Sequence, residues 1–384
     1  MAIHNFAAAW MTDEHQMLFD TASRFFKEQW APKDEAWRQA GMMDRSAWEE
    51  AGANGFLCAS MPEEYGGAGG DFGHEAVLIL AQGTAGISGF GGSLHSGIVA
   101  PYILHHGTEE QKKRWLSRLA TGELIGAIAM TEPGTGSDLQ AVRTTAVREG
   151  DEYVLDGSKC FISGAGSTDV LIVMARTGED GAKGISCFLV PTATPGYSVA
   201  RVERKMGQHA SDTCQIVFDN CRVPASALLG KEGEGYKIAL SNLEAGRIGI
   251  AAQSIGMARA AFEAAVRYAK ERVTFGVPII EHQAVNFRLA DMNTLLDAAR
   301  LMVWRAATLK DAGKPCLKEA SMAKMFASEA AEKIASDAIQ IHGGVGYTSD
   351  FPVERIYRDV RICQIYEGAN DIQRLVIGRS IAAE

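Results

Sequence analysis

The spacing of apolar residues changes twice along this chain of 384 residues, and this change limits the possible folds most strongly. Residues 13 to 120 follow mainly the helical period. From about 123 to 230 the apolar runs become short, often β-branched and bounded by turn residues, which is typical of strands without intervening helices. The helical period returns at 234 and continues to the end. The pattern predicts an α+β multidomain fold with three parts: an N-terminal helical domain (1–122), a middle antiparallel β-domain (123–230) and a C-terminal helical domain (231–384).

The composition is that of an ordinary globular protein and excludes several classes. Apolar residues make up 47% of the chain and charged residues 22%. The 38 Lys and Arg residues are outnumbered by 47 Asp and Glu residues, so the net charge of −9 argues against nonspecific nucleic-acid binding. The seven cysteines are scattered and contain no CxxC pair. We therefore expect reduced cysteines, no disulfide framework and no metal site.

One stretch is long enough to be weighed as a membrane span. Residues 76 to 108 contain no Asp, Glu, Lys or Arg, but repeated glycines and Pro101 interrupt them. This stretch is too polar and too broken for the hydrocarbon core of a bilayer, so we predict two buried helices with a glycine-rich joint. The N-terminus has no charged segment followed by an apolar run, so we expect no signal peptide and a cytoplasmic protein.

Two further helices can be outlined from their side chains. Residues 109 to 119 form a charged amphipathic pattern, and Thr108 can cap its N-terminus. Residues 286 to 309 carry apolar side chains over a broad arc, so we expect this helix to be buried in a bundle or at a subunit interface. His105 and His106 are adjacent and point about 100° apart on a helix, so we do not expect them to chelate one metal.

Several common catalytic and cofactor motifs are absent. No Gly-x-Gly pair continues as GxGxxG, and the chain contains no GxxxxGK[ST], HExxH or GxSxG. A Rossmann dinucleotide site, a P-loop, a zincin site and a nucleophile elbow are therefore not predicted.

Two segments of the middle domain have compositions suited to a ligand. In MTEPGTGSDL (130–139), glycines allow the backbone to approach a ligand closely, and Thr131 and Ser137 supply hydroxyl groups. In KCFISGAGSTD (159–169), Phe161 is suited to cover a planar ring and Ser163 to bond its edge. Taken alone, the first segment also fits an ordinary β-turn and the second the end of a strand.

Two segments of the C-terminal domain carry charges beside turns. Arg272, in AKERVTFG (269–276), is suited to bind a pyrophosphate, although it also fits a solvated residue at a helix C-terminus. Glu367, in IYEGANDIQR (365–374), precedes Gly368 and a helix start for which we expect Asn370 or Asp371 to be the N-cap. A carboxylate in this position is suited to act as a base, although it also fits a capping or solvated residue.

Together, these segments resemble a known family. MTEPGTGSD, ERVTFG, IQIHGGVGY and IYEGANDIQR are similar to signature segments of the acyl-CoA dehydrogenase family of flavoproteins, in the family's order. The resemblance extends over about residues 10 to 383. It implies a helical domain, a β-domain and a four-helix-bundle-like C-terminal domain. It also implies an FAD cofactor and a homotetramer built as a dimer of dimers, in fatty acid metabolism or lipid degradation.

The resemblance assigns residues to the cofactor site. On one side of the flavin it implies Met130, Thr131, Gly136 and Ser137, with Phe161 and Ser163 where the family often has Trp and Thr. A neighbouring subunit is implied to contribute the pyrophosphate and adenosine contacts, from Arg272, Thr274, Phe275, Gln340, Gly343 and Gly344, and to place Gln283 near the flavin. Asn370 and Asp371 match positions that touch the flavin side.

The resemblance also implies a reaction, the oxidation of a saturated acyl-CoA to a trans-2-enoyl-CoA. Glu367 matches the base that takes the α-proton, while hydride passes from the β-carbon to flavin N5 and electrons leave to an electron-transfer flavoprotein. The backbone N–H of Glu367 is implied to polarise the thioester carbonyl. Some members carry the base before an Arg on another helix, but here Gly246 stands in that position. Ser137, Glu244, Arg247 and Gly368 match other contacts of the acyl-CoA.

Other interpretations and the substrate stay open. An O₂-using oxidase or monooxygenase of the same fold, and a binding protein that has lost the flavin, are alternatives. The N-terminal half resembles long-chain members, whereas the position of the base resembles short- and medium-chain members. Neither acyl chain length nor pathway follows from the sequence, so β-oxidation, branched amino-acid degradation and other side-chain degradation all stay open.

Overall fold

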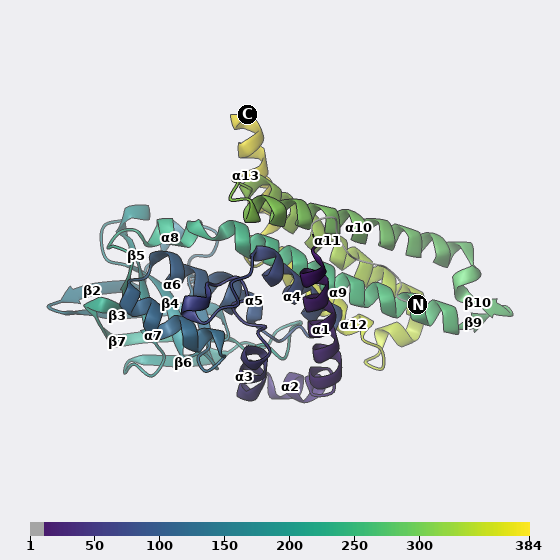
Figure 1. Ribbon diagram of the computed structural model, residues 1–384, viewed down its shortest axis with the longest axis horizontal. Coiled ribbons are helices and arrows are strands. Elements are labelled where there is room, and N and C mark those ends of the chain that lie inside the picture. Colours follow the sequence, from purple (N-terminus) through teal and green to yellow (C-terminus); the bar gives the residue numbers. More distant parts are fainter. Residues whose placement is uncertain (1–10) are drawn as a thin grey trace.

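The computed structural model describes residues 11–384 and has three regions in chain order. Figure 1 shows an elongated molecule with the sheet at one end, the long C-terminal helices at the other and the N-terminal helices between them. The last helix projects away from the rest. The predicted fold class is confirmed.

Capping residues define several helices of the N-terminal region. These helices are α1 (Asp13–Phe25), α2 (Asp34–Ala40), α3 (Arg45–Ala53), α4 (Phe72–Thr84), α5 (Gly92–Leu94), α6 (Ala100–His106) and α7 (Glu109–Ala120). Thr12, Asp71 and Thr108 each cap a helix, in a capping box with the third helical residue. The predicted cap at Thr108 is therefore confirmed.

The uncharged stretch at 76–108 forms buried helices and not a membrane span. Most of α4 is buried, and a glycine-rich joint separates it from a π-helical turn, His95–Val99, that leads into α6. In the described chain, every helix falls short of the length and apolar character that crossing a bilayer requires.

The middle region is one eight-stranded sheet with the order β6-β7-β3-β2-β4-β5-β8, and β1 also pairs with β4. Its strands are β1 (Gly126–Ala129), β2 (Thr145–Glu149), β3 (Glu152–Ser163), β4 (Val170–Arg176), β5 (Ile185–Pro191), β6 (Tyr197–Val202), β7 (Thr213–Pro224) and β8 (Leu228–Leu229). The sheet is mixed and not wholly antiparallel as expected, because β1 runs parallel to β4. The β2–β3 hairpin lies between these strands in sequence, and so long a connection allows the chain to return in the same direction.

Long helices dominate the C-terminal region. They are α8 (Gly235–Ser241), α9 (Leu243–Glu271), α10 (Gln283–Asp311), α11 (Leu317–His342), α12 (Val353–Val360) and α13 (Asn370–Ala383), with a small hairpin of β9 (Val273–Thr274) and β10 (Val277–Pro278). One face of α10 is buried against the other helices, as the bundle alternative predicts. On its other side Phe287 is 63% exposed and Leu301 57% exposed.

A single buried carboxylate joins all three regions. Asp359 on α12 accepts a hydrogen bond from the Ser88 hydroxyl at 2.7 Å and another from the Gln208 backbone N–H. Ser88 follows α4, and Gln208 precedes β7. Because burial and hydrogen bonding concentrate these contacts on one side chain, Asp359 fixes the mutual placement of the three regions.

His95 joins α7 to the start of β1. Its ring is fully buried, with Nε2 at 2.9 Å from the Leu119 carbonyl and Nδ1 accepting from the Gly126 N–H at 3.1 Å. This pairing requires the neutral ring with its proton on Nε2. Burial lowers the pKa of His95 to about 4, so the folded protein resists protonation of this ring.

We predict that the free energy of unfolding of His95→Gln depends less on pH than that of the wild type. Between pH 6.5 and 4 the unfolded chain binds a proton at His95 that the folded chain does not, so the free energy of unfolding falls as the pH falls. From pH 7 to pH 5 this residue contributes a loss of about 2 kcal/mol. Urea unfolding of both proteins at the two pH values measures it. An equal pH dependence in the two proteins contradicts the prediction.

Candidate active site

A buried ion pair organises the two ligand-type segments of the middle domain. The Lys159 ammonium on β3 lies 2.8 Å from Glu132 Oε1 and donates to the backbone carbonyls of Met130 (3.2 Å) and Met174 (2.6 Å). The Glu132 carboxylate also accepts the Arg143 and Thr144 N–H groups, at 2.7 and 2.9 Å. These bonds fix the 130–139 turn against β3 and β4.

The charges of this pair balance one another inside the protein. Burial lowers the pKa of Lys159 to about 8, while Glu132 acts in the opposite direction. Burial alone would raise the pKa of Glu132, but Lys159 and the surrounding donors hold it below its usual range. Each side chain therefore needs the other in order to stay charged without water.

The structure places Phe161 and the 130–139 turn side by side at an open surface. The Cys160 N–H donates to the Thr131 carbonyl at 2.9 Å, directly before Phe161. Phe161 has a φ of 58° and is 65% exposed. A left-handed backbone and a solvated aromatic ring are each unfavourable, which marks Phe161 as a residue suited to a covering ligand.

The remaining predicted residues of this group lie on the same segments. Met130 and Thr131 are half-buried, and Gly136 and Ser137 are exposed. A Cβ added at Gly134 or Gly136 would meet nothing within 4 Å, so this backbone faces open space. At these two glycines the turn is therefore open on its outer side, which a ligand cradle requires.

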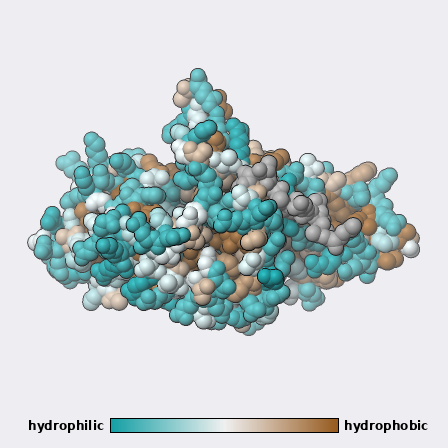
Figure 2. Space-filling model, viewed as in Figure 1, coloured by the Kyte–Doolittle hydropathy of each residue, from teal (hydrophilic) through white to brown (hydrophobic). Residues whose placement is uncertain are grey.

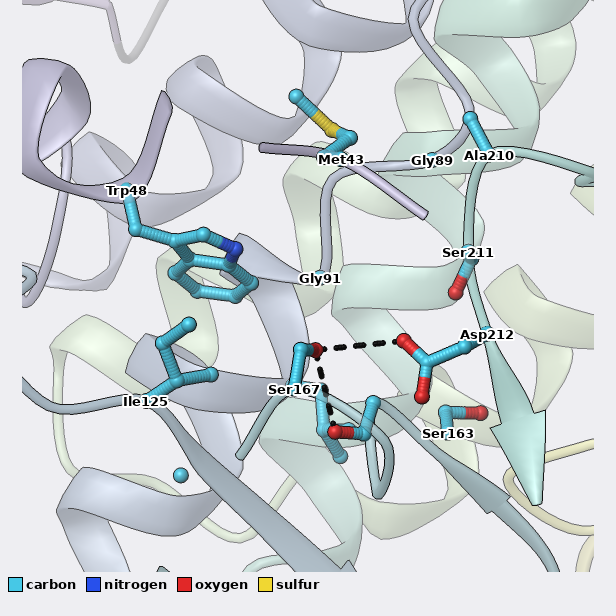
Figure 3. Close-up of a pocket in the computed structure, with 13 residues that line it drawn as sticks. Met43, Trp48, Gly89, Gly91, Ile125, Ser163, Ser167, Ala210, Ser211 and Asp212 are labelled. Carbon is cyan, nitrogen blue, oxygen red and sulfur yellow. Dashed lines mark hydrogen bonds between the residues drawn. The ribbon is translucent and has the colours of Figure 1, made fainter. Parts of the chain in front are cut away.

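Figure 3 shows a cavity beside Ser163. Its volume is about 30 Å³. It lies between the N-terminal region and the sheet, and is lined by Met43, Trp48, Gly89, Gly91, Leu94, Ile125, Gly126, Ser163, Gly164, Ser167, Ala210, Ser211 and Asp212. The Ser167 hydroxyl lies 3.3 Å from Asp212 Oδ1 and 3.2 Å from the Gly164 carbonyl. This cavity has room for about one or two waters, and its polar wall holds the turn that follows Ser163.

The Glu367 side chain enters the interior from the loop before α13. Glu367 and Gly368 both have positive φ, 52° and 83°. The carboxylate approaches α9 so closely that a Cβ on Gly246 would lie 3.0 Å from Glu367 Oε2. Burial raises the pKa of Glu367, and the nearby Arg247 and Lys324 oppose that rise. The result is a half-buried carboxyl group with two cations nearby.

The start of α13 differs from the expectation. Ala369, and not Asn370 or Asp371, is the N-cap, and no side chain caps the helix. Asn370 is the first helical residue, and its amide is used instead by Lys324 and Ser328 on α11. Asp371 is exposed, with Arg374 at 3.3 Å. The prediction of a side-chain cap was wrong because a buried lysine uses the amide oxygen.

Arg247 and Glu244 lie on the first turns of α9 with different surroundings. Arg247 is buried and donates to the Ser321 hydroxyl at 3.0 Å. Burial lowers its pKa, while Glu367 and Glu244 raise it. The Glu244 carboxylate accepts from the Cys316 N–H at 3.1 Å, at the start of α11. Arg247 is thus near Glu367, whereas one oxygen of Glu244 is used in helix packing.

A second group of predicted residues lies far from the first. Figure 1 places the β9–β10 hairpin at the end of the molecule opposite the sheet. Phe275, at the hairpin turn, is 97% exposed with a φ of 53°. Arg272, Gln283, Gln340, Gly343 and Gly344 are exposed, and Thr274 is half-buried with its hydroxyl 3.0 Å from His282 Nε2. The structure of one chain does not bring this group to Glu367 or Phe161.

The surface near the hairpin is unusually apolar. Figure 2 shows hydrophobic surface gathered toward the end that carries α10 and the hairpin. Its exposed side chains include Val273, Phe275 and Phe287. An apolar surface of this kind marks a site of contact with another molecule.

One cluster of metal-type side chains lies outside these groups. His15, Asp71 and His74 place possible ligand atoms within 4.8 Å of one another. Both imidazoles take part in the capping boxes of α1 and α4, and His15 Nε2 bonds Asp71 at 2.9 Å. Helix capping therefore accounts for this cluster.

Sequence reasoning missed the two buried lysines, Lys159 and Lys324. Lys324 lies on the buried stripe of α11 with Ala320 and Ala327, at helical spacings of four and three residues. A lysine on an apolar stripe was a readable signal, since a buried ammonium group needs an acceptor.

Comparison with known families matches the chain to three successive models. They are described as the N-terminal domain (residues 12–123), middle domain (127–221) and C-terminal domain (233–382) of acyl-CoA dehydrogenase. An acyl-CoA dehydrogenase of Bacillus subtilis is 46% identical over 96% of this chain and 98% of its own length. The human mitochondrial short-chain specific acyl-CoA dehydrogenase is 43% identical over 96% of this chain and 90% of its own length.

Solved structures give the same result. An acyl-CoA dehydrogenase from Geobacillus kaustophilus is 39% identical, with a TM-score of 0.95 over 98% of this chain and 100% of its own. Butyryl-CoA dehydrogenase from Megasphaera elsdenii is 38% identical, with a TM-score of 0.93 over the same shares.

We predict that Lys159→Met destabilises the protein by about 3–5 kcal/mol, because it leaves the Glu132 charge buried without its partner. Replacing both partners, Lys159→Met with Glu132→Gln, is expected to recover part of that loss. Urea unfolding measures all three proteins. The surface pair Lys112–Glu109, also at 2.8 Å, provides the control, and Lys112→Met is expected to have a much smaller effect. Equal losses in Lys159→Met and Lys112→Met would contradict the prediction.

Proposed function

Because this chain belongs to the acyl-CoA dehydrogenase family, we propose that it oxidises a short saturated acyl-CoA to the trans-2-enoyl-CoA. The observation that carries the proposal is the half-buried Glu367 carboxylate, set on a left-handed backbone near two cations. The short acyl chain is inferred from the relatives named short-chain specific and butyryl-CoA dehydrogenase.

Glu367 is the proposed base. A thioester α-hydrogen is weakly acidic, so a carboxylate must face it without competing water. Burial raises the pKa of Glu367 and so makes the carboxylate a stronger proton acceptor, while Arg247 and Lys324 keep the ionised form accessible. Gly246 leaves the space beside Oε2 free, since a larger residue there would crowd the carboxylate.

The backbone N–H of Glu367 is the proposed donor to the thioester carbonyl. Among the described residues, this N–H has no hydrogen-bond acceptor. A donor fixed in advance toward the carbonyl oxygen favours the negative charge that develops there as the α-proton leaves. One residue would then supply both the base and the oxyanion donor.

The residues around Phe161 fit an FAD cofactor. The exposed ring of Phe161 and the uncrowded backbone at Gly134 and Gly136 form an open surface suited to a large planar ring. FAD, when bound, accepts the hydride that leaves the β-carbon. Phe161 would cover the ring, and Ser163 would bond its edge. Electron-transfer flavoprotein is the proposed acceptor of the electrons.

A second copy of the chain is proposed to complete the cofactor site. The Phe275 hairpin and the exposed Gly343 and Gly344 lie far from Phe161 in one chain, and they face open space. A neighbouring subunit would bring them to the pyrophosphate and adenosine of FAD. A cofactor site shared by two copies requires at least a dimer. With the family resemblance, it is the reason for proposing a homotetramer built from dimers.

Anaerobic titration of the flavin band with acyl-CoAs from C4 to C16 tests the proposal. Bleaching by short chains is the expected result. Bleaching by long chains alone would overturn the short-chain assignment, and no bleaching by any acyl-CoA would overturn the reaction.

We predict that Glu367→Gln retains its fold and flavin but loses roughly 10²–10⁴-fold in kcat, because an amide does not accept the α-proton. Turnover with an artificial electron acceptor measures kcat, and the visible spectrum measures bound flavin. Glu64→Gln, at an exposed carboxylate of the N-terminal region, is the matched control and is expected to be fully active. Activity in Glu367→Gln equal to that of the control removes the assignment of the base.

We predict that Arg272→Ala weakens FAD binding about tenfold, as expected for the loss of one charge-assisted hydrogen bond. The ratio of flavin to protein absorbance after gel filtration measures retention, and the elution volume reports the oligomer. Arg201→Ala, at an exposed arginine of β6, is the control. Unchanged flavin content in Arg272→Ala counts against its role.

A further inference from the structure

Lys324 is a buried cation whose bonds to the backbone after Glu367 the reaction outlined above does not use. It lies about two turns into α11, and its side chain has no exposure to solvent. Its ammonium group points to the loop that carries Glu367 and to the start of α13. A lysine is rarely buried in this way unless acceptors hold its charge.

The ammonium group binds the Gly368–Ala369 peptide unit, which begins one residue after the proposed base. Lys324 Nζ donates to the Gly368 carbonyl at 2.8 Å and to Asn370 Oδ1 at 2.9 Å. Gln373 Nε2 donates to the same Gly368 carbonyl at 2.8 Å and to the Glu367 carbonyl at 3.3 Å. Two side chains from different helices therefore hold the backbone of Glu367 and Gly368.

This backbone needs holding. A non-glycine residue at positive φ, such as Glu367 at 52°, occupies a sparsely populated conformation that persists only where surrounding contacts fix it. The Gly368 carbonyl on one side of Glu367 is held by Lys324, and the Glu367 N–H on the other side has no acceptor among the described residues. Lys324 thus acts on the orientation of both groups that the reaction uses.

Lys324 also differs from the other cation near the base. Arg247 on α9 keeps its charge at any ordinary pH. Burial lowers the pKa of Lys324 to about 8, and Arg247 acts in the same direction. The other groups that face Lys324 raise it: Cys363 from the turn before the loop, Glu367 itself and Glu329 on α11. Of the two cations, only Lys324 therefore titrates near neutral pH.

We propose that Lys324 is a positioning residue for the base: its ammonium form fixes the Gly368–Ala369 peptide directly after Glu367 and favours the ionised carboxylate of Glu367. The inference rests on the proposed function. In the charged form, Lys324 holds the loop and keeps the base ready. Loss of its proton removes one cation from beside Glu367 and weakens the bond to the Gly368 carbonyl.

The experiment compares Lys324→Met, Lys324→Arg and the wild type, each as the flavin-loaded enzyme, in kcat and KM from pH 6 to pH 10. Lys324→Met is expected to lose tenfold or more in kcat with little change in KM. The acidic limb of its kcat–pH profile is expected to move to higher pH by about one unit, because the loss of a neighbouring cation raises the pKa of Glu367. Lys324→Arg is expected to recover most of kcat and to lack the alkaline limb near pH 8, since arginine does not titrate there.

Lys333→Met is the matched control on the same helix. Lys333 is 59% exposed and pairs with Asp337. Its kcat and pH profile are expected to equal those of the wild type. The proposal is overturned if Lys324→Met keeps the wild-type pH profile, if its loss of kcat only matches a loss of flavin, or if Lys324→Arg keeps the alkaline limb.

A measurement without substrate separates this inference from the proposed function. Between pH 8 and 10 the unfolded chain binds a proton at residue 324 that the folded wild type does not. The melting temperature of the wild type, relative to Lys324→Arg, is therefore expected to rise over that range. If the melting temperature of the wild type does not rise relative to that of Lys324→Arg, the proposed titration of Lys324 is wrong. If the melting temperature does rise but no acyl-CoA bleaches the flavin band of the wild type, the titration of Lys324 stands and the proposed function is wrong.

Discussion

The pairing of Lys159 with Glu132 is the interaction on which the middle domain and its candidate site depend. Neither charge is stable alone in the sheet, so the 130–139 turn must return to β3 for the chain to fold. The same return places Thr131 beside Cys160 and sets Phe161 at the edge of that turn. A constraint of folding thus also builds a surface for a ligand.

Buried polar side chains repeat this principle at the other boundaries. Asp359 unites the three regions through Ser88 and Gln208, and His95 joins α7 to β1. In each case one side chain gathers donors or acceptors from segments distant in sequence. Apolar packing alone tolerates small slips between elements, whereas such bonds require one arrangement. Glu367, the proposed base, lies beside Gly246 of α9 and depends on the same fixed arrangement.

The parts of the structure that depend on local rules were predictable from the sequence. The cap at Thr108 and the alternation of helical and strand periods need only neighbouring residues. The parallel pairing of β1 with β4 was not predictable, because it depends on the path of the chain between them. Nor was the use of Asn370, since its partner Lys324 lies 46 residues away. The family resemblance named Glu367 as the base, but the strain and cations around it appear only in three dimensions.

The narrow space between Glu367 and α9 limits how such a site can change. A Cβ at position 246 would already lie 3.0 Å from Glu367 Oε2. A carboxylate carried on that Cβ would share the space of the Glu367 carboxylate, and two neighbouring ionised carboxylates repel until one takes up a proton. A base on α9 and a base on the loop before α13 therefore exclude one another. In a chain whose proposed base is Glu367, the missing side chain at Gly246 keeps the opposite wall of the site free of a competing carboxylate.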